Sequence, residues 1–105
     1  MSKRKKSISN DEVMVRELRA DPAYAFEYLK AALEDEQEPA VLMIALRHVA
    51  EAYGGVGKLA ADAGIRREVL YRALSPNGNP TLKTFLAVIK SLGLKIGIEG
   101  TAKAA

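Results

Sequence analysis

The sequence predicts an all-α domain with one short strand close to its C-terminus. Three observations lead to this prediction. Apolar residues recur at the three- and four-residue spacing of helices through most of the 105-residue chain. Residues that favour helix starts, and glycines that favour helix ends, stand at the boundaries of these segments. Residues 94–99, LKIGIE, instead alternate apolar and other side chains as a half-buried strand does.

The N-terminal half predicts three helices. The first begins at Ser9 or Asn10, which can cap it, and ends near Ala20. The pair Asp21-Pro22 then starts a second helix, because Asp is a good N-cap and Pro suits the first helical position. Its apolar residues follow helical spacing along AYAFEYLKAALED.

The third helix begins at Pro39 and ends at the glycine pair Gly54-Gly55. Its sequence, AVLMIALRHVAEAY, is apolar around most of the helix surface, so we expect it at the centre of the core. It carries the single histidine of the chain, His48, for which a packed or partly exposed imidazole is the expected role.

The C-terminal half predicts three shorter helices. Val56 to Leu74 forms two of them, joined at Gly64. A loop of turn-forming residues, SPNGNP, follows, and Thr81 caps a last helix that ends at Gly93. The strand at 94–99 cannot satisfy its own backbone groups, so it needs a partner, most simply the same strand of a second copy.

The charges are unevenly distributed. Residues 1–6 hold four basic groups, residues 7–55 carry a net charge of −6, and residues 56–105 carry +5. This pattern indicates two different partners, one of them nucleic acid. The alternative is a single solvated surface whose fields partly cancel. The basic residues 1–8 are expected to be disordered, residues 9–100 to form one domain, and residues 101–105 to be a tail.

Composition excludes several classes of protein and site. The chain has no cysteine, so it has no disulfide framework, thiolate zinc site or thiol nucleophile, and it fits the reducing cytoplasm. The longest apolar run, residues 40–46, is far too short to cross a bilayer, and the basic start is not followed by the apolar stretch of a signal peptide. Carboxylates gather near residues 34–38, but no nucleophile or ligand set accompanies them. We therefore expect no catalytic site, metal or cofactor; those carboxylates are a solvated face or a surface for a basic partner.

Residues 56–75 match the pattern of a helix-turn-helix with Gly64 at the turn. Ala60 is small, as the close crossing of the two helices requires. The five positions expected to face inward are all apolar: Leu59, Ala63, Ile65, Leu70 and Ala73. The positions left facing outward on the second helix are Arg66, Arg67, Glu68, Tyr71, Arg72 and Ser75. Their donors suit phosphates and guanine edges, and the tyrosine ring suits a thymine methyl.

Two arginines at the start of a helix oppose its macrodipole, which favours anionic side chains there. A phosphate docking at that end would reverse the sign of the effect, whereas in water screening makes the mismatch nearly harmless. We expect Arg67, Tyr71 and Arg72 to read bases. The predicted phosphate contacts are Arg66, Lys58 and Lys83.

Two of these assignments have structural alternatives. Arg72 can instead form an ion pair with Glu68 four residues earlier. Tyr71 can simply cover the core with its hydroxyl in water. The loop residues 77–79 are expected to hold the loop's shape rather than to touch DNA.

The segment LAADAGIRREVLYRALSPNGNPTLKTFLAVIKSLGLKI resembles the addiction-module antidote proteins, small HigA-like antitoxins of the Xre/Cro type. The matching motifs are LAADAG, LYRALSPNGNP and KSLGLKI, which run from about Val56 to Ile98. The acidic helices before them resemble the family less distinctively. Gly57 and Arg66 depart from the family pattern, because Ser or Thr caps are common at both positions.

The resemblance implies a lambda-repressor-like domain of five helices that dimerises and binds double-stranded operator DNA upstream of its own operon. It also implies neutralisation of a basic RelE/ParE-type toxin encoded beside it. The sequence-based prediction is therefore a DNA-binding antitoxin and autorepressor. The alternatives are a stand-alone Xre/Cro-type transcriptional regulator without a toxin, and a protein-interaction module that keeps the fold without binding DNA.

Overall fold

The computed structural model describes residues 10–35 and 38–102, and that part of the chain is helical, with no strand. The helices are α1 (Asn10–Ala20), α2 (Pro22–Leu33), α3 (Pro39–Ala52), α4 (Val56–Ala63), α5 (Arg67–Ala73) and α6 (Leu82–Ser91). The all-α prediction is confirmed. Within the described ranges, none of the helices is long and apolar enough to cross a membrane.

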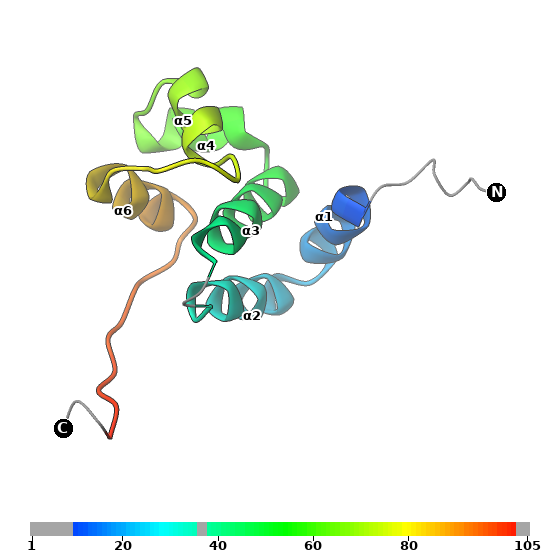
Figure 1. The fold of residues 1–105 in the computed structure, drawn as a ribbon. Helices are drawn as coiled ribbons and strands as arrows, with labels where there is room; N and C mark the ends of the chain where they lie inside the picture. Colours follow the sequence, from blue (N-terminus) through cyan, green and yellow to red (C-terminus); the bar gives the residue numbers. More distant parts are fainter. Residues whose placement is uncertain (1–9, 36–37, 103–105) are drawn as a thin grey trace.

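Helix α3 lies at the centre of the molecule (Figure 1). Helices α1 and α2 pack against α3 and against each other, while α4 packs against α3 and also contacts α5 and α6. The largest fully buried side chains come from nearly every element: Leu18, Leu46, Val56, Leu70, Leu74 and Val88. The prediction that α3 forms the central core helix is confirmed, since six of its residues are buried.

The helix starts predicted at Asp21-Pro22, Pro39 and Thr81 are confirmed, while Ser9, a predicted cap of the first helix, lies outside the described residues. Asp21 caps α2, its Oδ1 accepting the Tyr24 backbone N–H at 3.2 Å, and Thr81 caps α6 by accepting the Thr84 N–H at 3.1 Å. Pro22 occupies the first turn of α2. Because proline lacks an N–H and its ring opposes a preceding helical turn, the chain breaks between α1 and α2. The described chain therefore has six helices, and the count of five implied by the resemblance is wrong.

Side chains tie α1 to the other helices. His48 on α3 lies 2.7 Å from the Asp11 carboxylate of α1 through Nε2 and 2.7 Å from the Tyr28 hydroxyl of α2 through Nδ1. At the other end of α1, the Arg19 Nε donates to the Ala52 carbonyl at 3.1 Å, close to the C-terminus of α3. A cation there offsets the negative end of the α3 dipole. Both ends of α1 are thereby fixed to α3.

The predicted strand at 94–99 is absent. These residues follow α6 as an irregular, drawn-out segment that leaves the helices (Figure 1). A strand exists only as part of a hydrogen-bonded ladder, and the described part of this single chain offers no second strand. The predicted disordered N-terminus, residues 1–8, and residues 103–105 of the predicted tail lie outside the described residues.

Candidate nucleic-acid interface

Helices α4 and α5 form the pair predicted around Gly64. Gly64 has a φ of 72°, in the left-handed region where glycine is favoured, and ends α4. The Ile65 N–H then donates to the Ala60 carbonyl at 2.9 Å, which closes the turn. Ala60 is 1% exposed, as expected for the small residue at the crossing, and Leu70 is fully buried. The chain thus presents one face of α5 to solvent.

The exposed face of α5 begins with two arginines. Arg66 is the N-cap residue, in extended conformation, and its side chain makes no capping hydrogen bond. Arg67 is the first helical residue, and both side chains are exposed, as are those of Glu68 and Arg72. The start of α5 therefore carries positive charge and lacks a side-chain cap.

Two arginines lie over the ring of one tyrosine of α5, and a third arginine lines the same hollow. The Arg67 guanidinium lies 5.7 Å from the centroid of the Tyr71 ring, and the Arg47 guanidinium of α3 lies 5.2 Å from it. Arg72 and Glu68 line the same shallow hollow. We call Arg47, Arg67, Tyr71 and Arg72 the arginine–tyrosine cluster. Cation–π attraction to the ring favours these positions of the two guanidinium groups, and their N–H donors remain available.

Sequence reasoning missed Arg47. Its one signal in the sequence is that it is a lone cation within the apolar stretch of α3. Nothing local places it next to Tyr71, which lies 24 positions later in the chain. The contact arises only because α3 and α5 are packed into one body.

The ion pair considered for Arg72 does not form. Glu68 and Arg72 make no contact within 4 Å between their charged atoms, and the ion pairs among the described residues are Asp11–His48 and Lys58–Asp62. In the described part of the chain, no ion pair within 4 Å joins an arginine of the cluster to a carboxylate, and Arg47 shares a second hollow with Asp11, Glu12 and Glu51. The alternative for Tyr71 holds in part, because its ring packs partly against the core.

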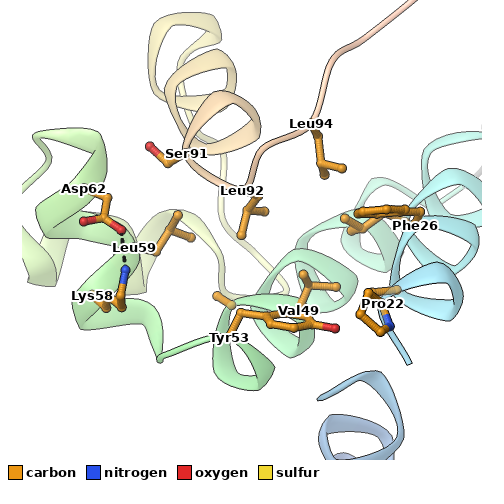
Figure 2. Close-up of a pocket in the computed structure, with 13 residues that line it drawn as sticks. Pro22, Phe26, Val49, Tyr53, Lys58, Leu59, Asp62, Ser91, Leu92 and Leu94 are labelled. Carbon is orange, nitrogen blue, oxygen red and sulfur yellow. Dashed lines mark hydrogen bonds and ion pairs between the residues drawn. The ribbon is translucent and has the colours of Figure 1, made fainter. Parts of the chain in front are cut away.

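Three other predicted site residues lie outside the cluster. Lys58 donates to the Asp62 carboxylate at 2.8 Å, and both line an apolar pocket of about 240 Å³ between α2, α3, α4 and the end of α6 (Figure 2). Lys83 is exposed in the first turn of α6. Ser75 is half-buried, and its hydroxyl donates to the Arg72 carbonyl at 2.8 Å, where it stabilises the end of α5.

The loop after α5 is shaped by Gly78. A Cβ placed on Gly78 would lie 2.0 Å from the Ala73 carbonyl oxygen, so a larger residue does not fit there. The Gly78 N–H donates to the Ser75 carbonyl at 2.8 Å. For Gly78, the predicted role in loop shape is confirmed, and the loop fixes how the chain leaves α5.

Comparison with known proteins covers nearly all of the described chain. A sequence model of the family described as "probable addiction module antidote protein" matches residues 12–100. An uncharacterized protein of Haemophilus influenzae is 40% identical over 72 residues, which cover 69% of this chain and 72% of that protein. No solved structure matches the chain. The motifs around α4 and α5, the acidic helices before them and this extended match agree: the chain belongs to the addiction module antidote family.

Proposed function

We propose that this antidote protein is a DNA-binding antitoxin that acts as a homodimer in the cytoplasm. It binds double-stranded operator DNA upstream of its own operon, represses that operon, and neutralises a basic toxin of the RelE/ParE type. In this proposal residues 56–75 are the helix-turn-helix of a lambda-repressor-like domain, and α5 enters the major groove. The protein has no catalytic role and needs no cofactor.

The observation that carries the DNA-binding proposal is the arginine–tyrosine cluster. Arg67 and Arg72 lie on an exposed helix face and form no ion pair with a described residue, so their donors are available for an external anion. Arg67, Tyr71 and Arg72 project from α5 itself and are assigned to base edges. Arg66, at the N-cap, and Arg47, on the neighbouring helix, are assigned to phosphates on either side.

Lys58 and Lys83 remain assigned to phosphates, but we expect them to contribute differently to DNA binding. Lys58 must exchange its ion pair with Asp62 for a phosphate, so its net contribution is small. Lys83 makes no such exchange, because it has no ion pair with a described residue. Glu68 is assigned as an acceptor for a cytosine amino group. Ser75 stabilises the end of α5, which presents these contacts.

The toxin is assigned to the acidic half of the chain. Membership in an antidote family implies a toxin partner of some kind. Residues 7–55, which include α1, α2 and α3, carry a net charge of −6, and Glu34, Asp35 and Glu38 are exposed at the junction of α2 and α3. A basic toxin would meet complementary charge on these helices.

Fluorescence anisotropy with the DNA upstream of the gene tests the DNA-binding proposal. Binding should weaken steeply as salt rises, because each neutralised phosphate releases counterions. Arg72→Ala should relax the sequence preference, whereas Lys90→Ala, which removes the same charge from the last turn of α6, should leave it unchanged. Absent or salt-independent binding would instead favour a protein-interaction module.

The second candidate is a stand-alone Xre/Cro-type regulator, which the cluster supports equally well. The product of the neighbouring gene distinguishes the two candidates. A small basic protein encoded beside this one, lethal when expressed alone and harmless when co-expressed with this chain, selects the antitoxin.

A further inference from the structure

We propose that residues 94–99 pair antiparallel with the same segment of a second copy, in the register that places Gly97 opposite the partner's Gly97. This interface deepens the homodimer of the proposed function by naming the segment and register that build it. It stands apart from the DNA contacts, since none of its residues belongs to the arginine–tyrosine cluster.

Among the described residues, the backbone of the segment has a hydrogen-bond partner at one end and none along the rest. The Leu94 N–H donates to the Ile89 carbonyl at 3.0 Å, and the Leu94 side chain points toward Phe26 (Figure 2). Beyond Leu94, no hydrogen bond joins the backbone of residues 95–100 to another described segment. Ile98 is 98% exposed. A row of free backbone N–H and C=O groups beside exposed branched side chains is a template for another strand.

The sequence of the segment is complementary to its own antiparallel copy. With Gly97 opposite the partner's Gly97, Lys95 lies opposite the partner's Glu99, and Ile96 opposite the partner's Ile98. The two-fold axis produces each of these pairs twice. A shift by two residues in either direction places both charges opposite uncharged residues. The Gly97 register is therefore the one in which each lysine faces a glutamate of the other copy.

The neighbouring surface supplies apolar area for such a dimer. Phe26 and Leu33 of α2 are 53% and 48% exposed, and they line one groove together with Ile96 and Ile98. Two short strands alone are marginally stable in water, so a strand pair needs an apolar face beside it. A second copy that pairs through this strand would place its own Ile96 and Ile98 in the groove. The proposed occupant of the groove is therefore a second copy of this chain.

Gly97 permits a direct test. A Cβ added there meets no other atom within 4 Å, and the chain contains no cysteine of its own. Facing residues of an antiparallel pair have Cα atoms about 4.5–5.5 Å apart, within the range a disulfide spans. Gly97→Cys should therefore form a covalent dimer under mild oxidation.

Glu99→Cys is the matched control, because its two copies would lie about 13 Å apart along the strands and cannot be bridged. The double variant Lys95→Cys/Glu99→Cys should cross-link, since it places a cysteine opposite each partner cysteine. Circular dichroism of each variant confirms that the helices are intact before cross-linking is compared.

Charge exchange tests the same register without cysteines. Lys95→Glu and Glu99→Lys should each weaken the dimer about tenfold in sedimentation equilibrium, because each creates two like-charge pairs. Combining both changes should restore the wild-type dissociation constant.

A monomeric wild-type chain, or cross-linking of Gly97→Cys no stronger than that of Glu99→Cys, would overturn the proposal. The proposal would also be overturned if Gly97→Cys formed a disulfide only with a cysteine introduced into the toxin, tested position by position. The segment would then pair with the toxin. Cross-linking with no operator binding would instead refute the proposed DNA-binding function and leave the interface standing.

Discussion

Arg47 is the residue whose position most changes the proposed interface. It extends the basic surface of α5 onto α3 and stacks against the same ring as Arg67. Because α3 is the central helix of the core, its backbone is held firmly, and the guanidinium is presented from a rigid support.

Arg47→Ala should weaken operator binding about tenfold and lower the slope of log K against log salt by about one, the signature of a single phosphate contact. Fluorescence anisotropy at several salt concentrations measures both. Lys90→Ala, with the same charge change on α6, is the control. An unchanged slope in Arg47→Ala would remove Arg47 from the interface.

Tyr28 makes a pH-dependent contribution to stability. Burial raises the pKa of its hydroxyl above 10.0, and the charges of Tyr24 and Asp11 raise it further. The folded state therefore holds the proton more tightly than the unfolded state does. The resulting stability is present below pH 10 and is lost as pH rises through the folded-state pKa.

Urea unfolding of the wild type should thus show stability falling above about pH 10, the ordinary pKa of tyrosine. The free energy of unfolding of Tyr28→Phe should fall less steeply in this pH range. This variant should be less stable than the wild type at neutral pH, because His48 loses a hydrogen bond. Equal slopes for the two proteins would contradict the assignment.

At the scale of the element, α5 carries a positive charge at its N-cap in place of a stabilising side-chain cap. Arg66 occupies the N-cap with φ −64° and ψ 140°, a conformation that suits a serine or threonine cap, yet its side chain makes no capping bond. The arginines at the start of this helix are explained if their anionic partner is DNA.

Arg66→Ser should therefore raise the free energy of unfolding by about 1 kcal/mol while weakening DNA binding. Urea unfolding and anisotropy on the same preparation measure the two effects. Arg66→Ala separates them, since it removes the charge without adding a cap. Improved DNA binding by Arg66→Ser would argue against a phosphate contact at this position.

The loop after α5 should be intolerant of a side chain. Gly78→Ala should destabilise the protein by about 1–3 kcal/mol, because the new methyl group meets the Ala73 carbonyl and the backbone must move. Gly100→Ala, where a Cβ meets nothing within 4 Å, should change stability little. Denaturant midpoints compare the two, and equal values would show that the loop yields freely.

At the scale of the whole molecule, α2 and α5 lie on different sides of α3 (Figure 1). The exposed carboxylates at the end of α2 and the arginines of α5 are thus presented on different sides of α3 (Figure 1), whereas Arg47 lies on α3 itself, in a hollow that it shares with Asp11, Glu12 and Glu51. If the toxin binds the carboxylates at the end of α2 and DNA binds α5, the two partners do not compete for the same surface.

We therefore expect a ternary complex. Adding the neighbouring toxin to the protein–operator complex should retard the DNA further in a gel-shift experiment rather than release it. Heat-denatured toxin is the control. Release of free DNA by native toxin would place the toxin on α5 instead.

Much of the fold could be predicted because helix boundaries depend on local chemistry. Asp21 and Thr81 cap the helices they were expected to cap, and Gly64 ends α4 in the left-handed conformation. The exposed arginines of α5 followed from the same periodicity. The strand prediction was wrong for the single chain because a strand depends on a partner, which local sequence does not supply.

The sequence by itself determined where the helices begin and end and which side chains α5 turns to solvent, since both depend on residues within one or two turns of each other. The tertiary structure alone decided that Arg47 of α3 meets Tyr71 of α5, and that Lys58 and Asp62 of α4 line an apolar pocket together with residues of α2, α3 and the end of α6. These contacts were decided by how packed helices set the distances between their side chains, together with the rotamers chosen there.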